Sequence, residues 1–145
     1  MGISNKQYGQ ILFLLKTLGN QITQNFEKKT GVSLTRYQML VLLSEGETVL
    51  QSSLQQSINI DSAAITRHLK ILEQHKFIER KRNPDNNREV LVKITEQGKE
   101  MFSTCMPGNK ELTIQLYKGI DSEKINILSE TLKILYENSK NEMER

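Results

Sequence analysis

Residues 61–95, "DSAAITRHLKILEQHKFIERKRNPDNNREVLVKIT", contain the signals that decide the fold. Asp61 is a favourable helix cap, because its carboxylate can accept hydrogen bonds from the free backbone amides of a first turn. A helix is therefore predicted over about residues 62–75, with Ile65, Leu69 and Leu72 on one face. The opposite face carries small and basic side chains, namely Ser62, Ala63, Thr66, Arg67 and Lys70. One side of this helix is expected to pack on a core, and the other side to face a partner.

Two stretches that favour β-strands follow this helix: "FIERKR" at residues 77–82 and "EVLVKI" at residues 89–94. The residues between them include Pro84 and Asn86. Proline fixes the backbone angle φ, and asparagine tolerates positive φ, so both favour a turn. The pattern predicts a β-hairpin with basic residues on its arms.

Two shorter helices are expected before this segment, over about residues 36–44 and from residue 49 to Asn59. Each starts with the spacing of a capping box, in which two side chains satisfy each other's backbone amides: Thr35 with Gln38, and Thr48 with Gln51. Asn59 falls where a helix end needs the left-handed conformation, which asparagine accepts better than most residues. The sharp turn there predicts a helix-turn-helix, and the hairpin after it makes a winged helix.

Longer amphipathic helices are predicted on both sides of this region. The first covers about residues 5–29, and the last is capped by Asp121. Between them, a helix after the hairpin is expected to break or kink at Pro107 and Gly108. The apolar stripes of the terminal helices are longer than one winged helix can cover, so they need a partner. The predicted fold is mainly α (α+β), with a winged helix-turn-helix DNA-binding domain at 35–106 and a helical dimerisation region at 1–34 and 107–145.

The excess positive charge lies in one segment. Residues 65–94 contain eight basic and four acidic residues, a net charge of +4, whereas the whole chain has a formal net charge of +3. The rest of the chain therefore has a net charge of −1. A basic cluster on a helix-turn-helix and its wing is the electrostatic pattern expected of a surface for DNA phosphates.

The predicted recognition helix suggests specific roles for its exposed residues. Arg67 can bind guanine O6 and N7, and the methyl group of Thr66 can contact a thymine methyl, so both are expected to contact bases. Ser62 and Lys70 are expected to bind phosphates. Ala63 is short enough to let the helix approach the DNA closely.

The hairpin is expected to lie along the neighbouring minor groove. Arg88 is predicted to enter the groove, where an A·T-rich stretch has a strong negative potential. The other basic residues of the wing are expected to contact the sugar-phosphate backbone: Arg80, Lys81 and Arg82.

Other classes of protein are not supported. The lone Cys105 cannot form an intrachain disulfide, and the longest apolar run, residues 11–15, is far too short for a membrane helix. A soluble cytoplasmic protein without membrane contact is therefore expected. No catalytic triad, glycine-rich phosphate loop or metal-ligand cluster stands out, and His68 and His75 are about 10 Å apart along a helix. We expect no enzyme activity, cofactor or metal.

The sequence resembles the MarR family of transcription regulators over nearly its whole length. The resemblance rests on "LTRYQMLVLL" at residues 34–43 and on residues 61–102, from the recognition helix through the wing. The family's wing motif, D-x-R followed by five residues and L-T, aligns with Arg88, Ile94 and Thr95. Asn86 stands where the family has the aspartate that steadies the wing arginine. Asp85 could take that role, or Arg88 could be left unrestrained.

The resemblance implies a homodimer whose terminal helices interleave, a near-palindromic operator, repression by occlusion, and a small lipophilic or phenolic effector. A pocket for it among Tyr8, Phe13, Phe26 and Tyr37 stays unassigned, because such residues usually form core. Activation instead of repression is an alternative. A cysteine-based redox sensor is another, although Cys105 beside apolar neighbours favours core packing and the family's sensors use a cysteine in the first helix. A winged-helix protein-interaction module is the third alternative.

Overall fold

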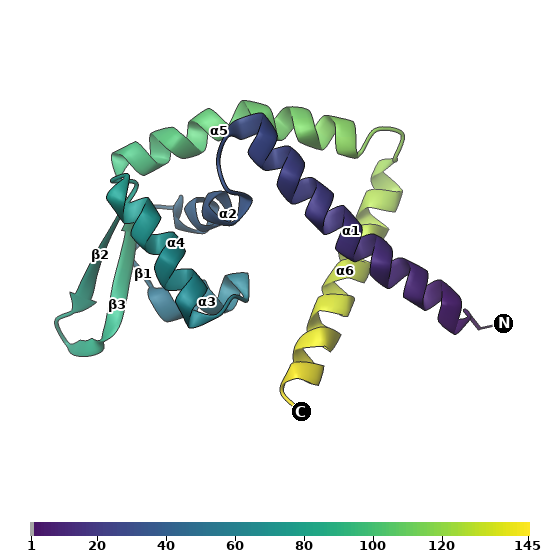
Figure 1. Ribbon diagram of the computed structural model, residues 1–145, viewed down its shortest axis with the longest axis horizontal. Helices are drawn as coiled ribbons and strands as arrows, with labels where there is room; N and C mark the ends of the chain where they lie inside the picture. The colour runs from purple at the N-terminus through teal and green to yellow at the C-terminus, as the bar shows by residue number, and fades with distance from the viewer. Residues whose placement is uncertain (1) are drawn as a thin grey trace. The chain divides into compact units, whose positions relative to one another are not determined.

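The protein is described by a computed structural model covering residues 2–145, apart from the side chains of residues 106–109. Its elements run in the predicted order of helices and hairpin, with one additional short strand, β1 (Figure 1). They are α1 Asn5–Thr30, α2 Leu34–Leu43, β1 Val49–Leu50, α3 Gln51–Ile58, α4 Ser62–Gln74, β2 Ile78–Asn83, β3 Asn86–Ile94, α5 Glu96–Leu116 and α6 Ser122–Met143. The predicted fold class, a mainly helical winged helix-turn-helix, is confirmed.

The two helix caps that the sequence predicts at aspartate residues are both present in the structure. The carboxylate of Asp61 accepts a hydrogen bond from the backbone amide of Ala64 at 2.7 Å, at the start of α4. Asp121 accepts one from Lys124 at 2.9 Å, at the start of α6. Both helices therefore begin where the sequence predicts.

Neither of the two predicted threonine capping boxes forms. Helix α2 begins before Thr35, because the hydroxyl of Ser33 accepts the bond from the amide of Arg36 at 3.4 Å. Residues Val49 and Leu50, which follow Thr48, are extended and pair with β3. The cap residue of α3 is consequently Leu50, which makes no side-chain cap bond. A strand pairing with a distant segment overrides the local capping pattern here.

The turn between α3 and α4 is the one predicted. Asn59 adopts the left-handed conformation, with φ of 59°, and its amide donates to the Gln55 carbonyl at 2.9 Å. This turn joins the two helices of the helix-turn-helix.

The three strands form an antiparallel sheet in the order β1-β3-β2. Strand β3 lies in the centre, where Val92 pairs with Val49 on one side and with Arg80 on the other. An irregularity follows Arg82, near the tip of the hairpin. Figure 1 shows this tip projecting beyond α4, as expected of a wing.

One core joins the helix-turn-helix to the sheet. Fully buried side chains from α2, α4, β2 and β3 meet in it, including Leu40, Ile65, Leu69, Ile78 and Val92. Burying a large aliphatic side chain stabilises the fold by about 1.5–3 kcal/mol. The predicted apolar face of α4 is therefore what attaches the recognition helix to the rest of the domain.

A second, smaller cluster joins α1, α2 and α5. The ring of Tyr37 lies 4.9 Å from the ring of Phe26 and 5.7 Å from that of Phe102, measured between centroids. Cys105 is buried in the same cluster, in agreement with its predicted core role. An ion pair between Lys29 and Glu111, at 2.7 Å, adds a link between α1 and α5.

Helix α5 packs closely against the end of α4 at its start. The hydroxyl of Thr95 donates to the Lys76 carbonyl at 2.6 Å and accepts from the amide of Gly98 at 3.0 Å. Helix α5 runs from Glu96 to Leu116 as one element, so the predicted break at Pro107 and Gly108 is wrong. The chain divides into two compact units, residues 1–112 and 113–145, so α6 belongs to the second unit.

Candidate nucleic-acid interface

The predicted recognition face is exposed on α4. Its apolar residues are buried, and the side chains on the other face are open to solvent: Ser62, Ala63, Thr66, Arg67 and Lys70. This division follows from the helical period, since residues three or four apart share a face. The hydroxyl of Thr66 donates a hydrogen bond to the Ser62 carbonyl at 2.8 Å, so this hydroxyl points toward its own helix. The face is therefore small and basic, with no acidic side chain among these five residues.

The exposed basic side chains of the wing include Lys81, Arg82 and Arg88. Arg82 donates from Nη1 to the carbonyl of Asn87 at 2.8 Å, across the hairpin. Two amide side chains organise the tip as well: Asn83 Oδ1 accepts from the Asp85 amide at 3.0 Å, and Asn86 Oδ1 accepts from the Arg88 amide at 3.2 Å. These local bonds shape the tip that carries Arg88.

The structure distinguishes the two alternatives at the wing arginine. Within the part of the chain that is described, neither the Asp85 carboxylate nor the Arg88 guanidinium forms a hydrogen bond or an ion pair. Asn86 binds the backbone of Arg88 and not its guanidinium. In this structure, then, Asp85 does not hold the Arg88 guanidinium.

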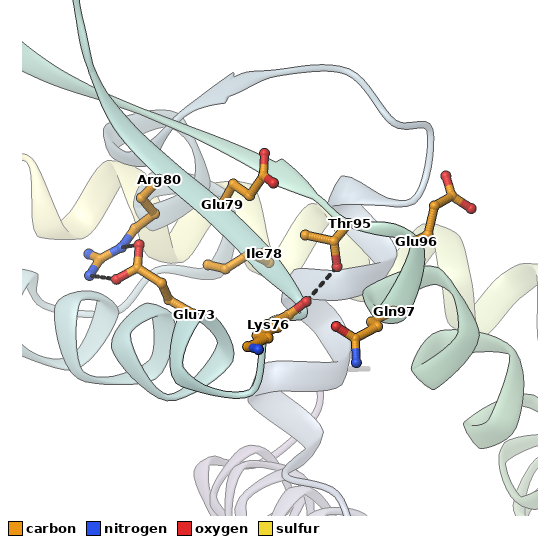
Figure 2. A pocket seen from close by; sticks show the side chains of 8 residues that line it. All are labelled: Glu73, Lys76, Ile78, Glu79, Arg80, Thr95, Glu96 and Gln97. Carbon is orange, nitrogen blue, oxygen red and sulfur yellow. Dashed lines mark hydrogen bonds and ion pairs between the residues drawn. The ribbon is translucent and has the colours of Figure 1, made fainter.

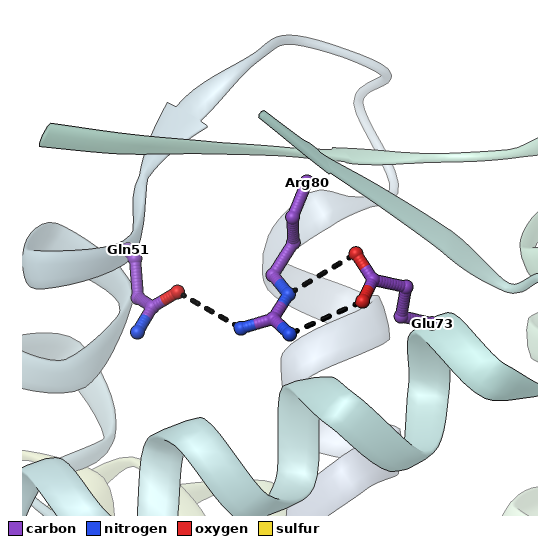
Figure 3. Close-up of polar contacts among 3 residues, drawn as sticks. All are labelled: Gln51, Glu73 and Arg80. Atoms are coloured by element: carbon purple, nitrogen blue, oxygen red, sulfur yellow. Dashed lines mark hydrogen bonds and ion pairs between the residues drawn. The ribbon is translucent and has the colours of Figure 1, made fainter. Parts of the chain in front are cut away.

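Arg80 differs from the other basic residues of the wing. Its side chain is only 19% exposed, and it forms an ion pair with Glu73 of α4 at 3.2 Å (Figure 3). It pairs in the sheet with the buried Val92, so both residues are on the sheet face toward the core. This inward position was not predicted from the sequence, because Glu73 and Arg80 lie in different elements.

An open groove separates the end of α4 from β2 and the start of α5 (Figure 2). Its lining contains three carboxylates and two basic side chains: Glu73, Glu79, Glu96, Lys76 and Arg80. A groove with more acids than bases repels a polyanion. The surface that suits DNA is consequently the exposed face of α4 with the wing, and not this groove.

The two histidines have separate surroundings. Nδ1 of His68 lies 3.3 Å from Nη1 of Arg36 on α2, a contact that the sequence did not predict. Burial lowers the pKa of His68, and the charges of Arg36 and Arg67 lower it further. His75 contacts its own helix, with Nδ1 at 2.8 Å from the Ile71 carbonyl, and stacks on Phe77. The described residues contain no cluster of three His, Cys, Asp or Glu that could hold a metal ion.

Burial also raises the pKa of the Cys105 thiol above its usual value. A thiol that stays protonated is a poor nucleophile and reacts slowly with oxidants. In the described part of the chain, no helix is both long enough and apolar enough to cross a membrane.

A helix-turn-helix with an exposed basic recognition helix, followed by a basic β-hairpin, defines the class of winged helix-turn-helix proteins. Residues 32–90 match the profile of the MarR family. The chain is 35% identical over 132 residues to the HTH-type transcriptional regulator YdgJ of Bacillus subtilis, covering 91% of this chain and 80% of that protein. The chain belongs to the MarR family, and it is a DNA-binding transcription regulator.

Solved structures share this fold. A variant of MarR from E. coli complexed with operator DNA superposes with a TM-score of 0.80 at 20% identity, over 92% of this chain and 99% of that chain. CouR from Rhodococcus jostii bound to p-coumaroyl-CoA superposes with a TM-score of 0.77 at 24% identity, over 86% of this chain and 90% of that chain. At such identities the likeness shows the fold alone.

Proposed function

We propose that the protein is a cytoplasmic homodimeric repressor that binds a near-palindromic operator and releases it when a small molecule binds. The observation that supports this most is the exposed face of α4, which is small and basic and lies beside a basic wing. A two-fold dimer would present two such helices to half-sites about one helical turn, ~34 Å, apart.

In this proposal Arg67 and Thr66 contact base edges, and Ser62 and Lys70 contact phosphates, while Ala63 allows close approach. Lys81 and Arg82 contact the backbone, and Arg88 enters the minor groove. Because the Arg88 side chain has no partner among the described residues, it is free to adapt to the width of the groove. The predicted backbone contact by Arg80 is not part of this set, since its guanidinium is already paired with Glu73.

DNA titrations with the protein's own upstream region test the proposal. Affinity should fall steeply as salt rises, because binding releases the counterions of several phosphates. Arg67→Ala should cost about 1–3 kcal/mol at one base position, whereas Arg88→Ala should weaken binding most on A·T-rich flanks. If the wild type bound no duplex, or bound with no dependence on salt, the protein-interaction alternative would be favoured.

The dimer is supported by apolar side chains that the single chain leaves open. In α1, Phe13 and Leu14 are each 68% exposed. In α6, Leu128, Leu132 and Leu135 recur at helical spacing and are each between 39% and 45% exposed. Exposed apolar surface repeated along two long helices marks a protein interface.

Sedimentation or light scattering tests the dimer directly. Leu132→Glu, on the stripe of α6, should shift the protein to monomers and weaken operator binding. Lys133→Glu, at the next position of the same helix, is the matched control and should leave the dimer intact. A monomeric wild type at micromolar concentration would contradict the proposal.

A cavity of about 160 Å³ lies among α2, α4, the end of α1 and the start of α5. Arg36, His75 and apolar residues such as Leu40 and Met101 line it. A cavity of about 150 Å³ admits one benzene ring, so a single-ring phenol or aromatic acid is the effector class that fits. A panel of such compounds should include one that releases the operator, and Met101→Trp, which fills the cavity, should abolish that response while leaving DNA binding.

A further inference from the structure

Arg80 connects the wing to the helix-turn-helix through all three guanidinium nitrogens (Figure 3). Nε donates to Glu73 Oε2 at 3.3 Å, and Nη2 donates to Glu73 Oε1 at 3.2 Å. Nη1 lies 3.5 Å from Oε1 of Gln51, at the start of α3. The side chain therefore lies between the two helices of the helix-turn-helix, and Figure 3 shows it reaching both.

The contact between Arg80 and Glu73 restricts the relative orientation of the two side chains as well as their distance. A guanidinium that binds both oxygens of one carboxylate fixes the relative orientation of the two groups as well as their separation. Glu73 is on α4, one turn after the recognition residue Lys70, and Arg80 is on β2, two residues before Arg82. The pair thus connects the element that would enter the major groove to the element that would reach the minor groove.

Partial burial strengthens the contact. The Arg80 side chain is 19% exposed and that of Glu73 is 41% exposed, whereas the neighbouring Lys81 belongs to the exposed residues. Charges removed from bulk water attract each other more strongly than exposed pairs do. The positive charge of Arg80 is also offset by Glu73, so it adds little to the potential that a phosphate experiences.

We propose that Arg80, Glu73 and Gln51 form a helix–wing clamp, which sets the position of the wing relative to α4 and so the spacing between the two groove contacts. Arg80 is a positioning residue in this arrangement and does not contact phosphate. The inference rests on the proposed function, in which both α4 and the wing touch DNA. It concerns how the two contacts are coordinated, and not whether DNA is bound.

The clamp and a phosphate contact predict opposite results at Glu73. If Arg80 contacted phosphate, Glu73→Gln would free the guanidinium and remove a repelling charge, and DNA binding would tighten. If Arg80 positions the wing, Glu73→Gln breaks the two-oxygen contact and binding weakens. The predicted loss is about 5- to 30-fold for either Glu73→Gln or Arg80→Gln.

The salt dependence of binding separates the two roles further. Each duplex phosphate contact contributes about 0.9 to the slope of log affinity against log salt, so a dimer that loses two contacts should lose about 1.8. Arg80→Gln and Glu73→Gln should change this slope to the same extent, because both act through the position of the wing, whereas the matched control Lys81→Gln, on the same strand, should reduce it by the direct loss of its own contact. Arg80→Lys keeps the charge but not the planar fork, and it should weaken binding nearly as much as Arg80→Gln.

Measuring Arg88→Ala with and without Arg80→Gln distinguishes two effects of losing Arg80. One is a displaced wing, and the other is a less stable protein. In a protein with the clamp intact, Arg88→Ala should weaken binding to an operator with A·T-rich flanks. With Arg80→Gln already present, the same change should cost clearly less, because the wing is no longer held in place. The Arg80→Gln and Glu73→Gln double variant should bind no worse than either single variant.

All of these experiments use the full-length protein and its upstream duplex. They are done at a temperature at which circular dichroism shows that every variant is folded. The clamp is refuted if Arg80→Gln lowers the salt slope while Glu73→Gln leaves it unchanged, or if Glu73→Gln tightens binding. It is also refuted if Arg80→Lys and Glu73→Gln both bind like the wild type. Absence of DNA binding by the wild type would instead overturn the proposed function, so the two failures are distinguishable.

Discussion

Nη1 of Arg36 on α2 lies 3.3 Å from Nδ1 of His68 on α4, and this contact links the recognition helix α4 to α2. An arginine side chain can only donate hydrogen bonds, so Nδ1 of His68 must be the acceptor. The imidazole is therefore neutral, with its proton on Nε2. Protonation of Nδ1 would remove the bond and place two positive charges side by side.

This contact makes stability depend on pH. The pKa of His68 is lowered in the folded protein by burial and by the charges of Arg36 and Arg67. Well above about pH 6.5 the histidine is neutral in both the folded and the unfolded state, and it contributes no pH dependence. As the pH falls through that value, the unfolded chain takes up a proton that the folded chain resists, so the free energy of unfolding decreases. The decrease stops below the folded-state pKa.

Urea denaturation at about pH 7.5 and about pH 5 measures this effect. His68→Gln should flatten the pH dependence, because an amide oxygen can accept from Arg36 without titrating. His75→Gln, which removes the other histidine, serves as the control and should leave the contribution of His68 in place. An unchanged pH dependence in His68→Gln would show that the contact is not the cause.

Gly98 allows α5 to approach the end of α4. A Cβ atom at this position would lie 2.1 Å from the carbonyl oxygen of Phe77 and 2.7 Å from Cγ1 of Ile94. That carbonyl also accepts a hydrogen bond from the Thr95 amide, so it cannot move freely. Gly98→Ala should therefore destabilise the protein by about 1–3 kcal/mol or more, despite the better helix propensity of alanine.

Gly19→Ala is the matched control for this measurement. Gly19 lies within α1, and a Cβ atom there would have no neighbour within 4 Å in the described structure. The change should stabilise the protein by up to about 1 kcal/mol. Thermal unfolding of the two variants should give shifts of opposite sign, and shifts of the same sign would contradict the close approach at Gly98.

Lys76 occupies a conformation that suits glycine, with φ of 62°. The left-handed region costs an ordinary side chain about 1–2 kcal/mol. Lys76→Gly should therefore raise the free energy of unfolding, even though the unfolded chain gains flexibility. Asn59→Gly, at a φ of 59°, should gain less because asparagine tolerates this region. A larger gain at residue 59 than at residue 76, measured in urea, would refute this account of strain.

Cys105 is predicted to be unreactive in the folded protein. Its side chain is only 3% exposed, and burial raises the pKa of its thiol, so little thiolate is present near neutral pH. A water-soluble thiol reagent should label it slowly in buffer and rapidly in urea. Peroxide at concentrations that leave the methionines intact should not change operator affinity. Rapid labelling of the native protein would revive the redox-sensor alternative.

Local sequence signals were sufficient for the elements that carry the proposed site. Asp61 caps α4, Asn59 makes the sharp turn, and the helical period separates Ile65 and Leu69 from the exposed face. The turn residues after Arg82 also predicted the hairpin correctly. These features depend on neighbours within a few positions of the chain, so the order of residues specifies them.

Only the tertiary structure decided the features that join separate elements. Pairing of Val49 with Val92 made a strand where the sequence predicted the first turn of a helix. The inward position of Arg80 and the Arg36 contact with His68 likewise depend on partners that other elements supply. The sequence by itself thus determined which residues could face DNA. Folding decided which basic residue is held by Glu73 and which are left exposed, because an ion pair depends on distance in space and not on spacing along the chain.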